Sequence, residues 1–456
     1  MATEDTAVAL TNATNRSRLW LAVALVLAGV GGRTGRRAAL RGVLSLGLAS
    51  AVGQLVKAVT DRRRPHRRRP PGLRSRTHTS SFPSGHTASA FAFATGVTAE
   101  AHLLGAPLVA AAVAVGAARV CVGEHHPSDV VAGAAMGVGL AALTTRVWPV
   151  SPGEAARARP VRSMNGAEPS PTGEGLTVVV NKNAGPALAR DPVTRLREGL
   201  PDARIVEIDD ADDLVGALED AAGGRAIGIA GGDGSVNAAA EIAQANDKPL
   251  LVVPAGTLNH LARDLGLESV DDAVEAVRTG SAAAVDVATI DGRPFLNTAS
   301  FGSYVELVDA REQLEKVIGK WPAVVVALIR VLRGAKPCDV EIDGTPMKVW
   351  MIFFGNCRYH PSGFAPSWRE RLDDGQIDVR IVEGDAPWSR LRLVAAVLTG
   401  RLGRSRVYTQ RRAKEVHVRS RTGPMRLARD GETFDGGEEF VVTKDGRTLP
   451  VYVAAE

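Results

Sequence analysis

The chain has 456 residues, which is too long for one ordinary hydrophobic core, so two or three domains are expected. Its net charge is +5, and eight arginines are concentrated between Asp61 and Arg76. No aromatic residues for base stacking are interleaved there, which argues against nucleic acid and favours anionic lipid or a phosphorylated substrate. The three cysteines lie far apart and predict neither a disulfide framework nor a metal cluster.

The first third of the chain is membrane-like. Its apolar runs are Leu19–Val30, Leu40–Val59, Thr87–Leu104, Ala106–Val122 and Val130–Val147. Each of the last four is about long enough to cross roughly 30 Å of hydrocarbon as a helix. The first is short, and either a full span or an interfacial segment is open for it. Long runs with little internal charge disfavour a soluble bundle, so residues 1–148 are predicted to form an all-α transmembrane bundle.

A linker rich in proline, glycine and charge is expected over residues 149–175, and the pattern then changes to that of a soluble protein. Residues 176–284 are predicted to form an α/β domain with a parallel sheet, because short β-branched runs alternate with helical stretches. These strands are Leu176–Val180, Arg204–Ile208, Ala226–Ala230 and Leu250–Val253.

Residues 285–456 are predicted to form an antiparallel β-sandwich, since short alternating strands dominate that part. The expected strands are Val285–Ile290, Val340–Ile342, Val349–Phe354, Ile377–Ile381, Glu415–Arg419 and Glu439–Val442. Helices are expected at about Trp321–Arg333 and Trp388–Leu402.

Cations and histidines suited to phosphate chemistry occur in the membrane-like region. Lys57, Arg64 and Arg119 can neutralise phosphate oxygens, and arginine offers paired donors that match phosphate geometry. With two histidines, one can attack phosphorus while the other protonates the leaving oxygen. Asp129 stands four residues after His125, within one turn if the segment is helical, and can hold that imidazole in one tautomer.

This arrangement resembles the type 2 phosphatidic acid phosphatase superfamily, which is related to the vanadium haloperoxidases. The matching motifs are Lys57 with Arg64-Pro65, Pro83-Ser84-Gly85-His86, and Arg119 with His125 and Asp129. Ala118 stands where that family usually has serine. The resemblance implies that His125 is the nucleophile, Asp129 its orienting partner and His86 the general acid. It also implies a metal-free phosphate clamp made by Lys57, Arg64, Arg119 and the amides of Ser84 and Gly85.

A second phosphate-binding pattern follows the strand at residues 226–230. The turn Gly231-Gly232-Asp233-Gly234-Ser235 lets the backbone approach a phosphate, and a helix predicted from Val236 supplies free N–H groups. Asp233 can act through Mg²⁺ on a transferred phosphoryl group. The turn lacks the Gly-Lys-Ser of common nucleoside triphosphatases and the spacing of a dinucleotide fingerprint.

From Leu176 onward the chain resembles the diacylglycerol kinase catalytic domain, which is shared with sphingosine and ceramide kinases. The resemblance implies that ATP is bound by Asn181, Lys182, Asn183, Ala184, Gly185, Gly231, Gly232, Asp233, Gly234, Ser235, Val236, Asn237, Thr257 and Asn259. It departs from the family at Ser235, where threonine is usual, and at His260, where aspartate is common. Asp209 falls where a threonine often contacts nucleotide.

Two later motifs complete this resemblance. The turn Asp373 to Asp378 implies a structural Mg²⁺ held by Asp374 and by the carbonyls of Arg371 and Gln376. Asp430-Gly431-Glu432 matches the motif that supplies the base for the lipid hydroxyl, and both Asp430 and Glu432 are candidates.

Together the patterns predict a bifunctional membrane enzyme. One domain removes phosphate from a lipid, and the other uses ATP and Mg²⁺ to phosphorylate diacylglycerol or a related lipid alcohol. Alternatively, the helical domain is only an anchor, or the kinase acts on a soluble acceptor. Because ATP is cytosolic, the kinase is placed in the cytosol and the phosphatase site faces outward. The eight arginines then lie outside, against the positive-inside rule.

Overall fold

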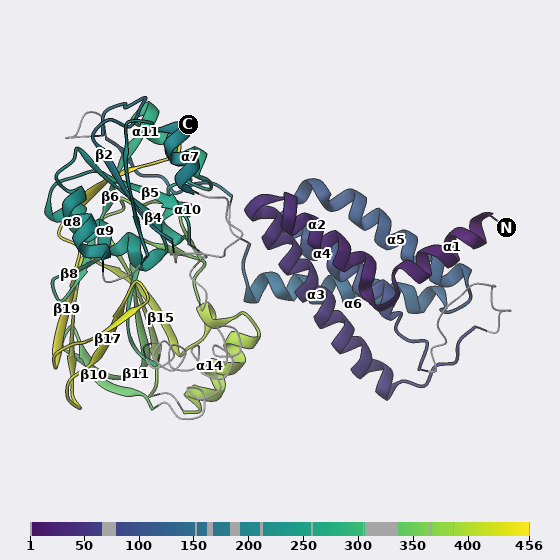
Figure 1. The fold of residues 1–456 in the computed structure, drawn as a ribbon. Coiled ribbons are helices and arrows are strands. Elements are labelled where there is room, and N and C mark those ends of the chain that lie inside the picture. Colours follow the sequence, from purple (N-terminus) through teal and green to yellow (C-terminus); the bar gives the residue numbers. More distant parts are fainter. Residues whose placement is uncertain are drawn as a thin grey trace. The chain divides into compact units, whose positions relative to one another are not determined.

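The computed structural model describes residues 2–65, 79–150, 153–161, 167–182, 192–209, 213–256, 259–303, 305, 336–363, 367–385 and 387–455. The chain forms two compact units (Figure 1): Met1–Gly153 with Leu398–Gly400, and Glu154–Val397 with Arg401–Glu456. The first is helical, and the second combines an α/β half with an antiparallel β half. This confirms the predicted fold class.

The helical unit contains α1 (Ala2–Ala13), α2 (Arg18–Val30), α3 (Gly32–Val59), α4 (Gly85–Glu100), α5 (Gly105–Cys121) and α6 (Pro127–Val147). Among the described residues, three segments are long and apolar enough to cross a membrane, namely Thr34–Val59, His102–Cys121 and Pro127–Val147. Helix α2 is apolar but shorter.

Helix α4 differs from the expected run Thr87–Leu104. It has 16 residues and packs against α3, α5 and α6, so most of its side chains are buried. Its last residue, Glu100, accepts hydrogen bonds from Arg37 at 3.0 Å and from Arg41 at 2.6 Å, and the chain leaves the helix at the next residue. A charge cluster therefore ends this helix earlier than the apolar pattern suggested.

Helices α4 and α6 approach closely because glycines face α4. A methyl group on Gly133 would come 2.5 Å from the carbonyl oxygen of Ser84, and one on Gly137 would come 2.3 Å from that of Ala88. Small residues four apart are typical of closely packed membrane helices. This contact fixes the start of α4 beside the start of α6.

A seven-stranded sheet forms the α/β half, in the order β1-β6-β20-β5-β4-β2-β3. Strands β20, β5, β4, β2 and β3 are mutually parallel. The bounds are β1 (Arg159–Pro160), β2 (Leu176–Asn181), β3 (Arg204–Ile208), β4 (Ala226–Gly231), β5 (Leu250–Pro254), β6 (Ala282–Asp286) and β20 (Thr448–Tyr452).

Helices cover both faces of this sheet (Figure 1): α8 (Leu214–Ala221) and α9 (Asp233–Ala245) lie on one, and α7 (Pro192–Gly199) and α11 (Val270–Thr279) on the other. The short α10 spans His260–Asp264. The core between these layers consists of buried aliphatic side chains such as Val178, Ile227 and Leu251.

Three features of this sheet depart from the predicted layout. Strand β1 lies within the expected linker and pairs with β6. The predicted strand Val285–Ile290 is divided at Val287 between β6 and β7 (Ala288–Ile290), which belong to different sheets. The C-terminal strand β20 returns to the α/β sheet, where it lies between β6 and β5.

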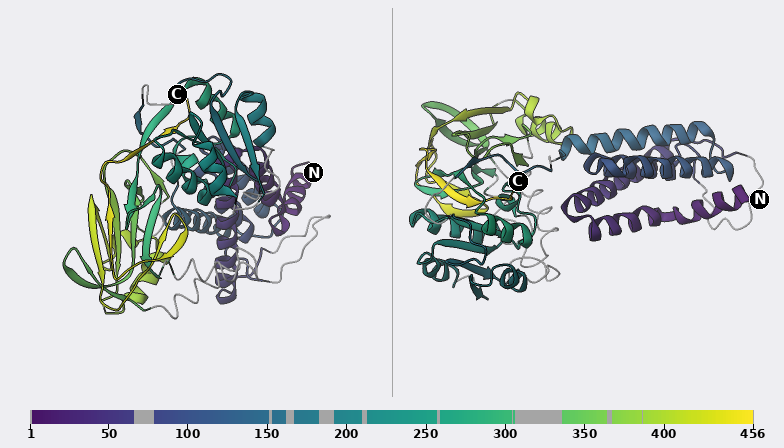
Figure 2. Two further views of the ribbon diagram at one scale, coloured as in Figure 1. Left: turned by 60° about the vertical axis from the view of Figure 1, so that its left-hand side comes forward. Right: turned by 90° about the horizontal axis from the view of Figure 1, so that it is seen from above.

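An eleven-stranded antiparallel sheet forms the other half (Figure 2), with the path β18-β17-β9-β11-β10-β16-β19-β7-β8 and β14 and β15 joined through β11. The bounds are β8 (Arg293–Phe295), β9 (Thr298–Gly302), β10 (Cys338–Ile342), β11 (Thr345–Asn356), β14 (Ile377–Glu383), β15 (Tyr408–Ala413), β16 (Glu415–Ser420), β17 (Arg426–Arg429), β18 (Glu432–Asp435) and β19 (Glu439–Thr443). Strands β12 (Tyr359–His360) and β13 (Trp368–Arg369) pair separately. Helix α14 (Ser389–Leu398) matches the helix expected from Trp388, whereas the helix expected at 321–333 lies outside the described residues.

Candidate functional site

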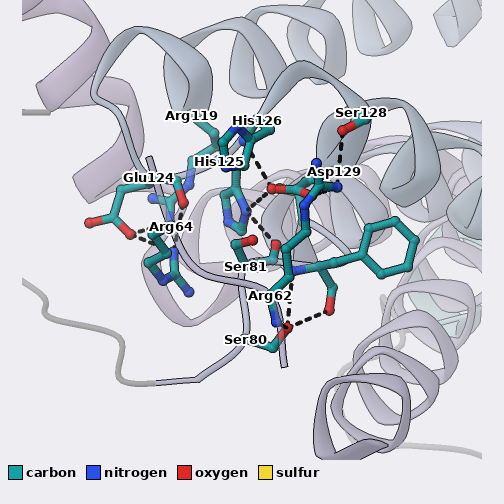
Figure 3. A network of polar contacts seen from close by, with 12 residues as sticks. Arg62, Arg64, Ser80, Ser81, Arg119, Glu124, His125, His126, Ser128 and Asp129 are labelled. Carbon is teal, nitrogen blue, oxygen red and sulfur yellow. Dashed lines mark hydrogen bonds and ion pairs between the residues drawn. The ribbon is translucent and has the colours of Figure 1, made fainter. Parts of the chain in front are cut away.

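His125 lies in the loop between α5 and α6, and its side chain is buried (Figure 3). Its Nδ1 is 2.7 Å from the carbonyl oxygen of Ser81. A carbonyl can only accept, so Nδ1 carries the proton and Nε2 keeps its lone pair. Burial lowers the pKa of His125, and the charges of Arg119, Arg64 and Lys57 lower it further. The imidazole is therefore neutral with a free nitrogen, as a nucleophile requires.

Asp129 stands in the first turn of α6 and is fully buried. One carboxylate oxygen accepts a hydrogen bond from Arg62 at 2.7 Å, and the other accepts one from the N–H of His126 at 2.9 Å (Figure 3). The latter oxygen is 3.7 Å from Nδ1 of His125. Asp129 thus caps its helix and stands near His125, but the Ser81 carbonyl makes the shorter contact with that imidazole.

The expected clamp cations surround His125. Arg64 donates to the carboxylate of Glu124 at 2.7 Å, and Arg119 lies 3.7 Å from the same group (Figure 3). Within the described part of the chain, Nε of Arg64 and Nε of Arg119 are buried without a hydrogen-bond partner. Two buried guanidinium N–H groups left unbonded are costly unless an anion accepts from them.

The start of α4 belongs to the same cluster of residues. A methyl group on Gly85 would come 3.4 Å from Nζ of Lys57, so the lysine ammonium lies over that turn. His86 is half-buried, and its Nε2 is 3.2 Å from the side-chain oxygen of Asn15. The N–H of Ser84 donates to the carbonyl of Asp129 at 3.0 Å. That N–H is already engaged, which departs from its expected place in the phosphate clamp.

Three members of this network were not singled out from the sequence. Arg62 was hidden in the arginine-rich run, Glu124 precedes His125 directly, and Ser81 contributes a backbone carbonyl that carries no side-chain signal. The position of Glu124 between two cationic motifs is the one pattern that could have marked it.

In the second unit, the expected nucleotide residues lie at one edge of the parallel sheet. Asn181 ends β2, and Gly231 ends β4 opposite Pro254, the last residue of β5. The carboxyl ends of parallel strands are where ligands bind in open α/β sheets. Helix α9 begins at Asp233, directly after Gly232, so its N-terminal N–H groups open at this edge. The amide of Asn181 also reaches the hydroxyl of Ser235 at 3.4 Å.

The two glycine-containing turns touch each other. A methyl group on Gly256 would come 2.6 Å from Cα of Gly232, so only glycine permits this approach. Asn259 has a left-handed backbone, and its side chain bonds both the N–H and the carbonyl of Gly256 at 2.9 Å. Asp233 accepts a hydrogen bond from the N–H of His260 at 2.8 Å. These contacts hold the two glycine-containing turns against each other.

The other residues expected to bind nucleotide lie in α9 and directly after β2. Val236 is buried in α9, and Asn237 of the same helix lines a small pocket with Asp430. Lys182 forms ion pairs with Glu207 at 3.3 Å and with Asp209 at 3.4 Å. The expected contacts at Asn183, Ala184, Gly185 and Thr257 lie outside the described residues.

The two candidate bases have different environments. The carboxylate of Asp430 accepts backbone N–H bonds from Leu296, Asn297 and Thr298 at 2.7–2.9 Å. Burial raises the pKa of Asp430 to about 6, against the effect of these donors. Glu432 begins β18 and is exposed, and a methyl group on Gly234 would come 3.2 Å from its Oε1. Glu432 therefore faces the glycine turn, whereas Asp430 is committed to the backbone.

The residues expected to hold a structural Mg²⁺ lie beside a buried ammonium, and Asp374 also stands close to Asp286 and Cys357 in a group that could hold a metal ion. Asp374 accepts N–H bonds from Arg358 and Gln376 at 2.9 Å, and Arg371 pairs with Asp373. The Gln376 carbonyl accepts a hydrogen bond at 3.1 Å from the buried ammonium of Lys444. A positive charge already lies against the expected oxygen ligands.

Comparisons with known proteins agree with this architecture. The PAP2 superfamily model matches residues 38–151, the diacylglycerol kinase catalytic domain matches residues 175–290, and the YegS C-terminal NAD kinase beta sandwich-like domain matches residues 305–442. The chain is 30% identical to a diacylglycerol kinase of Bacillus subtilis over 216 residues, which cover 44% of this chain and 69% of the relative. It is 28% identical to one of Mycobacterium tuberculosis over 213 residues, which cover 43% and 68%.

A solved diacylglycerol kinase structure from Bacillus anthracis is 18% identical, covers 61% of this chain and 97% of its own, and has a TM-score of 0.44. The chain belongs to the diacylglycerol kinase family and carries a PAP2 superfamily domain ahead of its kinase domain.

Proposed function

We propose that this chain is a bifunctional membrane lipid enzyme, with a phosphohistidine-type lipid phosphatase in residues 1–148 and an ATP-dependent lipid kinase in residues 176–456. The observation that carries the phosphatase half is the pair of buried, unbonded Nε–H groups on Arg64 and Arg119 beside a neutral His125. The kinase half rests on the family relationship and on the glycine turns at the sheet edge.

The phosphatase reaction proceeds in two steps. Nε2 of His125 attacks phosphorus, the bond from phosphorus to the ester oxygen breaks, and His86, in its protonated imidazolium form, gives its proton to the departing lipid alkoxide. Water then attacks the phosphohistidine and passes a proton to His86, which releases inorganic phosphate and restores both imidazoles. Lys57, Arg64 and Arg119 neutralise the charge on the phosphoryl oxygens throughout. The Ser81 carbonyl keeps the proton on Nδ1, so Nε2 stays available.

The kinase reaction transfers the γ-phosphoryl group of ATP to a lipid hydroxyl. Backbone N–H groups of Gly232–Ser235, where α9 begins, hold phosphate oxygens. Asp233 is the carboxylate at the turn that would hold Mg²⁺ bound with ATP, and the ion would neutralise further phosphate charge. Glu432 accepts the hydroxyl proton as the oxygen attacks phosphorus, and ADP leaves. Asp430 positions the loop through its three backbone bonds.

Two variants of the full-length protein in membranes test this proposal. His125→Asn removes the nucleophile and is expected to lower phosphate release from phosphatidic acid by about 10³-fold or more, while ATP-dependent labelling of lipid continues. Asp233→Ala is expected to do the reverse. If His125→Asn keeps its phosphatase activity and Asp233→Ala keeps its kinase activity, both site assignments are contradicted.

The alternatives predict different results in the same assays. If the helical domain is only an anchor, wild-type protein releases no phosphate from any lipid phosphate while its kinase is active. If the acceptor is soluble, labelled phosphate from ATP stays in the aqueous phase when total membrane lipid is supplied. Mass spectrometry of the labelled lipid identifies the acceptor.

A further inference from the structure

Lys444 is buried at the junction of the two sheets of the kinase unit. It lies between β19 of the antiparallel sheet and β20 of the α/β sheet, and its side chain is 1% exposed. Its ammonium donates to Sγ of Cys357 at 2.9 Å and to the carbonyl of Gln376 at 3.1 Å, and it forms an ion pair with Asp286 at 3.0 Å. Three acceptors match the three donors of an ammonium group. Asp374 lies slightly further away, at 3.5 Å.

The two carboxylates are also bonded to backbone N–H groups. Asp286 accepts from Gly375 at 2.8 Å, and Asp374 accepts from Gln376 and Arg358 at 2.9 Å. The carboxylates of Asp286 and Asp374 thus accept hydrogen bonds from backbone N–H groups, and both also face the ammonium of Lys444.

A divalent ion fits this environment poorly. Mg²⁺ needs about six oxygen ligands at 2.0–2.1 Å in near-octahedral geometry. Two of the three expected ligands, the carbonyl of Gln376 and the carboxylate of Asp374, lie 3.1 Å and 3.5 Å from the ammonium of Lys444. The ammonium approaches Asp286, Gln376 and Cys357 at ordinary hydrogen-bond distances. A dication placed against the same oxygens would meet this charge at short range in a medium that screens little.

We propose that the ammonium of Lys444 is the permanent cation of this turn and replaces the structural Mg²⁺ that the family resemblance implies. Asp286 ends β6 just before the chain crosses to the antiparallel sheet at Val287, and Lys444 stands where the chain crosses back. The ion pair between Asp286 and Lys444 links these two crossings. Cys357, which follows β11, and Gln376, in the turn at residues 373–378, accept hydrogen bonds from the same ammonium. The fold of the kinase unit is therefore independent of divalent ions, although Mg²⁺ still accompanies ATP.

Thermal unfolding of the full-length, nucleotide-free protein in detergent tests this proposal. The measured quantity is the change in Tm between excess EDTA and millimolar Mg²⁺, compared between wild type and Asp374→Asn, with Asp374→Ser as a second variant. We expect Mg²⁺ to change the Tm of the wild type and of both variants by the same amount, because no Mg²⁺ binds at Asp374. A Mg²⁺-dependent rise in wild-type Tm that both variants lose would overturn the proposal. Electron paramagnetic resonance with Mn²⁺ on the same samples counts the ions bound per chain, and it compares wild type with the Asp374 variants without unfolding the protein.

A second comparison tests the lysine itself. Lys444→Ala leaves a buried carboxylate without its cation and is expected to lower Tm by roughly 5–10 °C in EDTA. Lys414→Ala is the matched control, because Lys414 is exposed and contacts Lys444 only through its backbone carbonyl. Equal Tm values for the two variants would contradict the structural role of the ammonium.

Discussion

Asp129 serves two neighbours in the phosphatase pocket, and Arg62 decides how firmly it is held. The arginine contacts the buried carboxylate at 2.7 Å, whereas Nδ1 of His125 is 3.7 Å from it. The shorter imidazole contact goes to the Ser81 carbonyl, at 2.7 Å. A carbonyl can fix the tautomer of an imidazole but carries no full charge. The nearby carboxylate is therefore the group that can stabilise a positive charge developing on His125.

Arg62→Met should reduce phosphatase kcat about 10-fold, because Asp129 loses its ion-pair partner and is held only by the N–H of His126. KM should change less, since Arg62 contacts no clamp residue. Arg62→Lys should recover part of the rate. Arg63→Met is the control, because Arg63 is exposed and adjacent. The measurement is steady-state phosphate release from a lipid phosphate. Equal kcat for both Met variants would contradict a role for Arg62 at the site.

Glu432 and Asp430 should separate in the kinase assay. Glu432→Gln preserves shape and removes the proton acceptor, so kcat should fall about 10²-fold or more with an unchanged Tm. Asp430→Asn replaces an oxygen acceptor by an amide that cannot accept all three N–H bonds, so Tm should fall by several degrees. The measurements are lipid phosphorylation and thermal unfolding of both variants. A stable Asp430→Asn enzyme without activity, beside an active Glu432→Gln enzyme, would reverse the two assignments.

At the scale of the helix, the α4–α6 contact controls the phosphatase site from a distance. Gly137→Ala places a methyl group 2.3 Å from a carbonyl oxygen of α4, so the helices must separate. We expect a loss of about 1–3 kcal/mol in stability and a reduced phosphatase rate, with the kinase unaffected. Activity remaining after graded heating measures both effects.

Gly139→Ala provides the matched control for this contact. A methyl group at Gly139 meets no atom within 4 Å, and alanine favours the helix by up to about 1 kcal/mol. It should therefore be neutral or slightly stabilising. If Gly137→Ala behaves like Gly139→Ala, close packing of α4 on α6 does not position the site.

The elements of the chain were predicted unevenly, for physical reasons. Apolar run length and strand periodicity are local signals, so α3, α5, α6 and most strands of the sheets were foreseen. The end of α4 was missed because it depends on Glu100 meeting Arg37 and Arg41 from another helix. The place of β20 was missed because a short strand carries no mark of which sheet it joins.

The candidate sites show the same division. Motif spacing placed Lys57, Arg64, Arg119 and His125 in one region, and in the structure the charges of all three cations act on His125. Contacts made through the backbone were not foreseeable, and the Ser81 carbonyl on His125 is the clearest case. The roles of these residues stay predictions. Lys444 was overlooked because a buried lysine is recognised only when its acidic partners are brought to it by the fold.

At the scale of the whole molecule, the helix ends bear on membrane sidedness. Lys57 is in the last turn of α3, Arg119 in the last turn of α5, and Asp129 in the first turn of α6. Helix α6 has 21 residues, enough to cross roughly 30 Å of hydrocarbon before the chain enters the kinase unit. We propose that the phosphatase site faces away from the cytosol, because the kinase needs cytosolic ATP.

The arginine-rich run is the observation that opposes this topology, because arginines usually stay on the cytoplasmic side. Two of its members, Arg62 and Arg64, bind Asp129 and Glu124 in the described part of the chain. They are thus committed to the phosphatase pocket, which weakens their value as markers of sidedness.

Cys121 offers a native reporter of this topology, since it is the last residue of α5, at the helix end that carries Arg119 and leads into the loop of His125. A membrane-impermeant maleimide added to right-side-out vesicles should label Cys121 before permeabilisation, and Cys121→Ser should abolish that label. Cys338 belongs to the kinase unit and should react only after permeabilisation. Mass spectrometry of the labelled peptides separates the two sites. Labelling of Cys121 only after permeabilisation would place both active sites on the cytosolic side, where the kinase could rephosphorylate a lipid without its crossing the bilayer.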